Sequence, residues 1–463
     1  MHEARAFSFV CAGILSLMPL AVAAVAGEYA TWFASAVVDS SLPSPYADNS
    51  MAVDSLDRPH IVYYDYATND IRYATRSNGS WMVDTLEFGT GFDTGNNDAA
   101  PSLALDRQGR PHVVYTAMRN GLRVAVHAVK AAGAWSYDIV GEAADWCMFP
   151  RLALDAQDKP VVVYGRYNGS IWQVLYCERV AGEWSTRVVD EGDQPALALD
   201  SQGVPHIVYR GWTGGVFGKQ RYAVRSGSSW GIEQLNMMAS WHRLALDASD
   251  QPHITCKTGS YVYYIAKPGG TWTYTAVGRT MLDGHGAPLA LDWRGDPVMV
   301  FVDYQSHQLA WVYCRDGVWN QEWVDPDGEP LWGNTPALAL DPAGEPRVTC
   351  QVQPMLRYVE GVDNLRAEVA QEATIAFGLD PVRPNPTRSG ALTVHLTLPT
   401  ALPAQLELLD VAGRRITTRE VGSLGVGQHT LDLGQGLHLA PGLYLVRLTQ
   451  GVNTRTTRVM VLK

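Results

Sequence analysis

The chain has 463 residues, with 47 acidic residues against 36 basic ones and a net charge of −11. An acidic surface repels the phosphate backbone, so this balance argues against a nucleic-acid partner. Hydrophobic residues make up 46% of the chain, which is enough for a large core, and the length predicts one large domain and one small domain. No CxxC pair occurs among the six cysteines, and most of them lie in strand patterns. We therefore expect buried free thiols and neither a disulfide framework nor a metal site.

The first 26 residues have the pattern of a secretory signal peptide. Arg5 supplies the positive charge, Phe7–Val25 the apolar run, and Ala24-Val25-Ala26 the small-residue cleavage site before Gly27. The alternative is an uncleaved membrane anchor. No later apolar run is long enough to span a bilayer. The pattern therefore predicts an exported protein.

A strand, a tight turn and a second strand recur seven times before residue 360, as in Leu103–Tyr115. The first strand ends in an Asp, and the second begins with a Pro five residues later. The Asp residues are Asp54, Asp106, Asp155, Asp200, Asp247, Asp292 and Asp341, and the Pro residues are Pro59, Pro111, Pro160, Pro205, Pro252, Pro297 and Pro346. A period of 45 to 52 residues with this fixed punctuation is typical of a repeat architecture. Because the carboxylate can accept hydrogen bonds from its own turn, we interpret all seven Asp residues as structural.

Each full repeat contains four strand-like runs rich in Val, Ile and Tyr, which is the strand content of a propeller blade. In the second repeat these runs are Pro101–Asp106, Pro111–Tyr115, Leu122–His127 and Trp135–Val140. A Trp opens the fourth run in six repeats, at Trp81, Trp135, Trp184, Trp230, Trp272 and Trp319. Its recurrence after the same turn favours packing between blades over stacking on a sugar.

The seventh repeat ends without its fourth strand, and a matching strand occurs at the other end of the chain. Thr31–Asp39 is similar to Trp184–Asp190, the fourth strand of the third repeat. An amino-terminal strand in that place would complete the last blade and remove exposed sheet edges. We therefore predict an all-β chain with a signal peptide at 1–26, a seven-bladed β-propeller at 27–360 closed by its N-terminal strand, a linker at 361–374, and a small β-sandwich at 375–463.

In a propeller, the connections between the second and third strands and between successive repeats lie on one face, around the central channel. We call this the loop face, and it is the default binding site of the architecture. Its aromatic rings could cover apolar sugar faces while charged groups fix the orientation of a ligand. The alternative is that the rings plug the channel mouth or are single solvated side chains. The predicted ligand-binding residues are Tyr64, Asp65, Tyr66, Arg119, Arg166, Tyr167, Trp212, Trp241, His242, His285, Asp303 and Tyr304.

Metal and catalytic signals are weak in this sequence. No HExxH and no P-loop occurs. A His follows the second-strand Pro in four repeats, and we interpret these residues as structural and not as a metal ring: His60, His112, His206 and His253. The loop Asp93–Asp98 could hold calcium through carboxylate and amide oxygens, or could simply be solvated. We expect no cofactor and no resident metal.

The repeats resemble the secreted bacterial propellers that include sialidase-like and BNR-type proteins, from Trp32 to about Val359. The Asp box of that group is present only as remnants, such as Ser77–Trp81. The resemblance implies a function at glycans. We expect a non-catalytic protein that binds a glycan or a protein. The alternatives are a glycan-active hydrolase or lyase of sialidase-like type, and a passive structural protein of the cell surface.

The segment from Ile375 to Lys463 is basic, with nine Arg and Lys residues against five Asp and Glu residues. It contains the motifs DPVRPNP at Asp380–Pro386, DVAGRR at Asp410–Arg415 and LAPGLYLV at Leu439–Val446. These motifs resemble the carboxyl-terminal sorting domain of type IX secretion cargo and the FlgD-type Ig-like domain. The resemblance implies export through the periplasm and the outer-membrane secretion machinery to the cell surface or the medium. The residues alone indicate a small antiparallel sandwich, and a purely structural module is the alternative. We expect a monomer.

Overall fold

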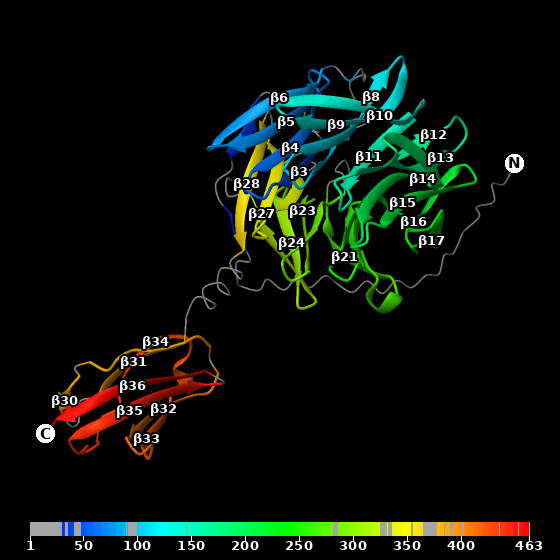
Figure 1. Cartoon of the computed structure of the whole chain (residues 1–463). Helices are drawn as coiled ribbons and strands as arrows, with labels where there is room; N and C mark the ends of the chain where they lie inside the picture. The colour runs from blue at the N-terminus through cyan, green and yellow to red at the C-terminus, as the bar shows by residue number, and fades with distance from the viewer. Residues whose placement is uncertain are drawn as a thin grey trace. The chain divides into compact units, whose positions relative to one another are not determined.

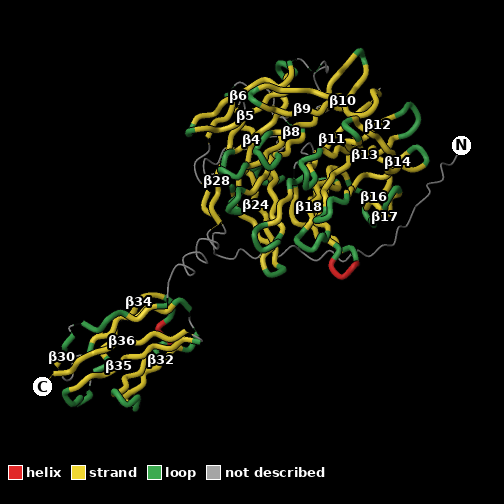
Figure 2. The backbone as a smooth tube through the Cα atoms, in the orientation of Figure 1, coloured by secondary structure: helices red, strands yellow, loops and turns green. Residues whose placement is uncertain are grey.

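The computed structural model describes residues 30–32, 36–40, 48–88, 90, 100–144, 146–280, 286–324, 331, 336–352, 355–363, 377–383, 385–388, 392–400, 402–434, 436–451 and 453–462. These residues form an all-β protein, as predicted (Figure 2). Two single turns of 3-10 helix, η1 (Pro268–Gly270) and η2 (Gly422–Leu424), are the exceptions within the described ranges. The chain divides into two compact units, the first ending at Val362 and the second beginning at Asp363. No helix of the described residues is long and apolar enough to cross a membrane.

Six sheets make up the described part of the first unit, and Figure 1 shows them side by side around a common centre in a propeller-like arrangement. Strand β14 belongs to two repeats, because its first half pairs with β13 and its second half with β15. The first two sheets are β3 (Asn49–Val53), β4 (Pro59–Asp65), β5 (Asp70–Ser77) and β6 (Ser80–Glu87), and then β7 (Ser102–Leu105), β8 (Pro111–Arg119), β9 (Leu122–Ala131) and β10 (Ala134–Ala144). The third sheet spans two repeats and consists of β11 (Trp146–Leu154), β12 (Pro160–Tyr167), β13 (Trp172–Val180), β14 (Glu183–Leu199), β15 (Pro205–Thr213), β16 (Val216–Ser226) and β17 (Ser229–Gln234). The last three sheets are β18 (Ser240–Leu246), β19 (Pro252–Thr258), β20 (Tyr261–Ala266) and β21 (Thr273–Arg279); β22 (Leu289–Leu291), β23 (Pro297–Val302), β24 (Leu309–Arg315) and β25 (Val318–Trp323); and β26 (Ala337–Leu340), β27 (Pro346–Val352) and β28 (Met355–Asp363) with β1 (Ala30–Trp32) and β2 (Ala36–Asp39).

The first strand of each repeat lies beside the first strands of its two neighbours. Strand β3 contacts β7, β7 contacts β11, β11 contacts β14, β14 contacts β18, β18 contacts β22, β22 contacts β26, and β26 contacts β3. No single sheet of the described strands closes on itself. The amino-terminal strand β2 pairs antiparallel with β28, with Ala36 opposite Tyr358. The two ends of the first unit are thus hydrogen-bonded to each other.

The turn between the first and second strands is held by its Asp, as predicted. In the second repeat, one carboxylate oxygen of Asp106 accepts from the N–H of Gln108 at 2.9 Å and of Arg110 at 2.8 Å. Gly109 follows with a φ of +73°, in the left-handed region that glycine adopts without strain. Both bonds recur in five other turns, those of Asp54, Asp155, Asp200, Asp247 and Asp292. Asp341 accepts the bond from the N–H group four residues later. We call the face that carries these turns the turn face.

The recurring Trp packs between repeats, which confirms that prediction. Each ring lies edge-on against an aromatic ring on the third strand of the preceding repeat, with centroids 4.9 to 5.6 Å apart. The pairs are Trp81–Tyr358, Trp135–Tyr73, Trp184–His127, Trp230–Tyr176, Trp272–Tyr222 and Trp319–Tyr264. Trp32 of β1 makes the same contact with Trp311 of β24, at 5.4 Å and 68°. Trp32 therefore packs the last repeat against the repeat before it, as the other six Trp residues do for their own repeats.

The recurring histidines are structural, as the repeat pattern indicated. His60 shares a hydrogen bond of 2.5 Å between its Nδ1 and the hydroxyl of Tyr73, which holds the second strand to the third. His253 does the same with Tyr264 at 2.6 Å, and His112 lies 3.1 Å from His127. The cysteines of the described chain are free thiols, four of them buried, as expected: Cys147, Cys177, Cys256, Cys314 and Cys350.

Two sheets that share one hydrophobic core form the second unit. The first sheet consists of β29 (Gly378–Leu379), β31 (Thr393–Leu398) and β34 (Gly427–Asp432), and the second of β30 (Thr387–Arg388), β36 (Asn453–Leu462), β35 (Gly442–Gln450), β32 (Ala404–Asp410) and β33 (Arg415–Glu420). Pairing is antiparallel except between β30 and β36. Alternate residues of facing strands, such as Leu396, Leu406 and Val446, are buried in the core between the sheets.

Candidate binding sites

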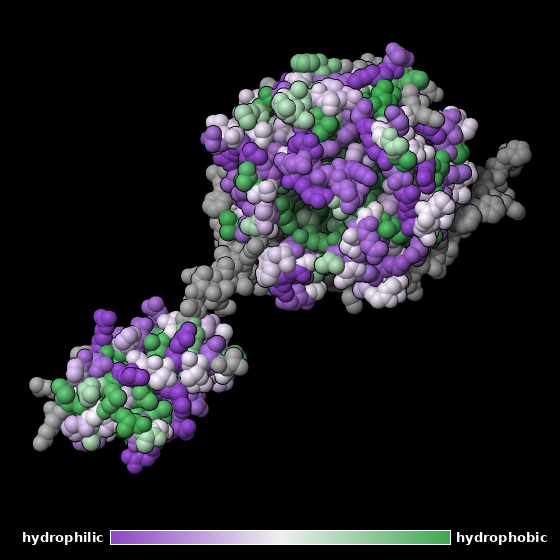
Figure 3. All heavy atoms as spheres, viewed as in Figure 1, coloured by the Kyte–Doolittle hydropathy of each residue, from purple (hydrophilic) through white to green (hydrophobic). Residues whose placement is uncertain are grey.

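The first unit encloses a central cavity of about 310 Å³. In Figure 3 this unit is hollowed at its centre, with hydrophobic residues on the walls and hydrophilic residues around the opening. The lining comes from the first strands of six repeats and from residues just before them. Its apolar part includes Leu103, Leu244, Leu289 and Leu338. Its position on the axis makes it the natural ligand site of the repeat architecture.

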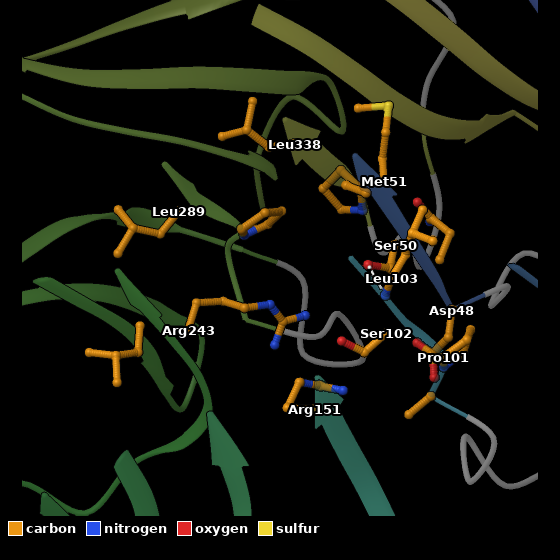
Figure 4. A pocket seen from close by; sticks show the side chains of 16 residues that line it. Asp48, Ser50, Met51, Pro101, Ser102, Leu103, Arg151, Arg243, Leu289 and Leu338 are labelled. Atoms are coloured by element: carbon orange, nitrogen blue, oxygen red, sulfur yellow. Dashed lines mark hydrogen bonds between the residues drawn. The ribbon is translucent and has the colours of Figure 1, made fainter. Parts of the chain in front are cut away.

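Two arginines extend into this cavity, Arg151 from β11 and Arg243 from β18 (Figure 4). Both stand four residues before the turn Asp of their repeats. The same register position holds a small residue or proline in the other five repeats: Ser50, Ser102, Ala196, Pro288 and Ala337. Arg151 and Arg243 are therefore exceptions at a register position that otherwise holds a small residue or proline.

The fold gives these two charges little compensation. Arg151 donates from Nη1 to the carbonyl of Pro150 at 3.0 Å, and Arg243 donates to the carbonyl of His242 at 3.1 Å. Neither arginine forms an ion pair with a carboxylate of the described residues. Burial and, to a smaller extent, the charge of Arg243 lower the pKa of Arg151 to about 9, while Asp48 opposes the shift. Burial also lowers the pKa of Arg243, but arginine is not deprotonated in proteins at neutral pH, so both groups carry a positive charge.

A second candidate site is an aromatic cluster on the loop face, formed by Tyr167, Trp172, Trp212 and Phe217. All four rings are half-buried. Trp172 lies 5.5 Å from Tyr167 and 6.4 Å from Phe217 between ring centroids, and Trp212 packs edge-on against Phe217 at 4.6 Å. The guanidinium of Arg210 stacks on Phe217 at 3.5 Å. The cluster joins hairpins of two neighbouring repeats, β12–β13 and β15–β16.

Polar side chains flank this aromatic cluster. Arg166 donates from Nη2 to Oε1 of Gln173 at 2.9 Å, which fixes a guanidinium and an amide beside the rings. Arg210 donates to both carboxylate oxygens of Asp193, at 2.8 and 2.6 Å. Burial raises the pKa of Asp193, although Arg210 opposes the shift. The bidentate pair holds Arg210 flat against the neighbouring ring and leaves Asp193 buried below the surface.

Three predicted site residues are buried and serve the fold, which corrects their assignment to the binding surface. Tyr64 is 2% exposed and donates to Oδ1 of Asn69 at 2.6 Å. Asp65 is 1% exposed, ends β4, and forms an ion pair with Arg72 at 2.6 Å. His242 is 2% exposed, and burial lowers its pKa to about 4. Tyr64 and Asp65 are the last two residues of β4, and His242 lies near the start of β18.

The other predicted residues are spread over the unit. Tyr167 and Trp212 meet in the aromatic cluster, with Arg166 beside them. Elsewhere, Tyr66 packs on Tyr64, Arg119 pairs with Glu87, Trp241 packs on Phe149, Asp303 caps its own turn, and Tyr304 lies under Arg279. His285 and the calcium candidate Asp93–Asp98 lie outside the described residues. Within the described ranges, no group of three or more His, Cys, Asp or Glu residues could hold a metal ion.

Sequence reasoning missed Arg151, Arg243, Trp172 and Phe217. The two arginines could be recognised from the sequence, because the equivalent position in the other repeats holds a small residue or proline. Trp172 is the first residue of β13 and Phe217 the second residue of β16, but their proximity depends on the angle between two hairpins. That angle cannot be read from one sequence.

Comparison with known proteins identifies the carboxyl-terminal part of the chain. Residues 382–462 match the family described as the secretion system C-terminal sorting domain. This match confirms the resemblance seen in the carboxyl-terminal motifs, and it shows a protein secreted to the cell surface or the extracellular space. Among curated proteins, none matches the chain.

Several solved structures are similar to the chain at low identity. A polysaccharide lyase described as an ulvan lyase is 11% identical over 71% of this chain and 95% of that chain, with a TM-score of 0.48. The Aleuria aurantia lectin, solved with Fucα1-6GlcNAc, is 14% identical over 63% and 99%, with a TM-score of 0.44. An α-L-arabinofuranosidase of Fusarium graminearum is 10% identical over 72% and 98%, with a TM-score of 0.42. Similarity of this size assigns no activity to the chain.

Proposed function

We propose that the protein is a secreted, non-catalytic glycan-binding protein whose first unit is a closed seven-bladed β-propeller. The pairing of β2 with β28, the contact of Trp32 with Trp311 and the unbroken succession of neighbouring first strands support closure. We further propose a signal peptide at 1–26, the propeller at 27–360, a linker at 361–374, and an Ig-like sorting domain at 375–463. In this scheme the sorting domain engages the outer-membrane secretion machinery after the chain has reached the periplasm.

The observation that carries glycan binding is the aromatic cluster on the loop face. Tyr167, Trp172, Trp212 and Phe217 hold one another in fixed orientations, so their exposed surfaces are arranged before a ligand arrives. Aromatic faces suit the C–H faces of sugar rings, and the neighbouring amide and guanidinium groups suit sugar hydroxyls. An aromatic residue stands seven positions after the second-strand Pro in four repeats, at Tyr66, Tyr167, Trp212 and Tyr304. Two of these rings, Tyr167 and Trp212, are joined by Trp172 and Phe217 into one cluster across neighbouring repeats.

Catalysis at the same cluster is disfavoured by its carboxyl groups. Glycoside hydrolysis commonly requires two carboxyl groups on either side of the scissile bond. Asp193 adjoins the cluster through Arg210, but both of its oxygens accept from that arginine and its side chain is buried. The described residues of the cluster therefore provide a shallow aromatic surface without an accessible carboxyl pair. This favours binding over a hydrolase, and cleavage by elimination or binding of a protein ligand are the other outcomes of the test.

The test is a glycan-array screen of the purified mature protein, followed by incubation of each bound glycan with a large amount of protein. We expect binding to one class of glycan, and mass spectrometry should show that the glycan is unchanged. Trp212→Ala should lose the array signal. Trp293→Ala is the matched control, because Trp293 is 44% exposed on the turn face. Cleavage of the bound glycan would refute the non-catalytic assignment, and an empty array with folded protein would refute glycan binding.

A further inference from the structure

We propose that the central cavity is a binding site for one oxyanion group, a carboxylate or sulfate, held between Arg151 and Arg243. The two side chains come from β11 and β18, on either side of the repeat that begins in the second half of β14. That intervening repeat has Ala196 at the equivalent register position, opposite Val208. Ala196 is buried in the core between repeats and adds no polar group to the cavity lining. This site is separate from the aromatic cluster.

The protein keeps two like charges in an enclosed space without using them to hold its fold. Each guanidinium makes one hydrogen bond, to the carbonyl of the residue just before it. That contact anchors the side chain locally and joins no two strands. Burial lowers the pKa of both arginines, and the charge of Arg243 contributes to the lowered pKa of Arg151. Asp48 also lines the cavity and opposes both shifts, but one carboxylate offsets only part of the charge of two arginines. Partly compensated charge in a cavity is characteristic of a functional site, where a ligand supplies further counter-charge.

Guanidinium groups determine the ligand class. Arginine presents a planar fork of N–H donors that matches the two oxygens of a carboxylate or sulfate. The hydroxyls of Ser50 and Ser102 each accept an N–H bond of 3.2 Å, from Leu103 and Leu152, so their O–H groups can still donate. Together these groups form a set of donors suited to an anion. The chain as a whole is acidic, so general attraction by net charge does not explain binding here.

The cavity volume restricts the size of the ligand. A volume of about 310 Å³ is at the lower end of small-molecule sites, which favours one sugar ring or a small acid over an internal stretch of polymer. The Leu side chains of the wall provide an apolar surface for the body of such a ligand (Figure 4). The oxyanion can therefore be a free anion or the acidic group of a uronic or sulfated sugar. These two sources share the same recognition chemistry.

The experiment is calorimetric titration of the purified mature protein with sodium sulfate, glucuronic acid and neutral glucose. We expect sulfate or glucuronic acid to bind and glucose not to bind. Tighter binding of glucuronic acid identifies a sugar ligand, whereas tighter binding of sulfate identifies a free anion. Arg151→Met and Arg243→Met should each weaken binding about tenfold or more, because each removes a charged hydrogen-bonding group. Arg107→Met is the control, since Arg107 is an exposed arginine of the turn face.

Thermal melts separate a binding role from a structural one. With the repulsion removed, the two Met variants should melt at or above the temperature of the parent protein. If a Met variant does not fold, the Lys variants keep the charge but lose the fork, and they must still weaken anion binding. The proposal is wrong if neither anion binds the parent, if the variants bind as well as the parent, or if both Met variants melt markedly earlier. Trp212→Ala should leave anion binding intact, so failure of this site and failure of the proposed loop-face function are distinguishable.

Discussion

Replacing Trp32 with alanine should lower the free energy of unfolding of the first unit by about 3 kcal/mol. Loss of a buried Trp commonly costs about 3–5 kcal/mol, and Trp32 is half-buried, which places it at the lower end. Its edge-on contact with the buried ring of Trp311, at 5.4 Å, accounts for about 1 kcal/mol of that loss. The loss is large because Trp32 lies on the amino-terminal strand that we propose closes the ring.

Gly361 provides an independent test of the same contact. A Cβ atom at this position would lie 2.8 Å from Cζ3 of Trp32 and 2.9 Å from Cγ of Pro346. Gly361→Ala should therefore destabilise the first unit by about 1–3 kcal/mol through overpacking. In the Trp32→Ala background most of the obstructing atoms are gone, so the same substitution should cost less. The double variant should be more stable than the sum of the single effects by at least about 0.5 kcal/mol.

Tryptophan fluorescence during urea denaturation is the assay, because all 15 Trp residues lie at or before Trp332 and so report on the first unit alone. Trp293→Ala is the control, and its effect should stay within about 0.5 kcal/mol, as for most exposed substitutions. A Trp32→Ala variant as stable as this control, with additive effects at Gly361, would refute the reasoning and with it the closure of the ring.

Three further predictions concern stability and export. Burial lowers the pKa of His127 to about 3 and of His242 to about 4, against about 6.5 in an unfolded chain. Since the unfolded state then binds more protons below about pH 6.5, stability that is complete above this pH should fall by about 2 kcal/mol per histidine at about pH 5, in urea titrations at several pH values. Asp106→Ala should cost about 2 kcal/mol through two lost turn bonds, and Asp106→Asn clearly less, measured by the denaturation midpoint. Removal of Ile375–Lys463 should leave a folded first unit in the periplasm, and cell fractionation that finds it in the medium would contradict the sorting role.

The features that could be predicted from the sequence are those that depend on local or repeated interactions. The Asp of each turn bonds N–H groups two and four residues away, so its role follows from sequence spacing alone. The Trp recurs because every repeat meets its neighbour in the same way, and that repetition also revealed the likeness between the segments around Trp32 and Trp184. The carboxyl-terminal motifs were recognisable for a similar reason, since their turn and strand residues are adjacent in sequence.

The site was harder to predict because it depends on where strands end and which side chains converge. Tyr64 and Asp65 follow an apolar run, but β4 continues through them and buries both. Arg151 and Arg243 lie within first strands, so a prediction based on the loops between strands does not include them. Only the arrangement of first strands around one axis shows that these two charges face the same cavity.

The most direct test of the account is calorimetric titration of the glycan found by the array into the parent protein, Trp212→Ala and Trp293→Ala. Truncation of an aromatic anchor commonly costs about 2 kcal/mol or more, so Trp212→Ala should weaken binding roughly thirtyfold. Trp293→Ala should bind like the parent protein, and both variants should show the parent's unfolding transition. Equal affinity in Trp212→Ala and the parent protein would contradict the claim that the aromatic cluster of the loop face is where this protein binds its ligand.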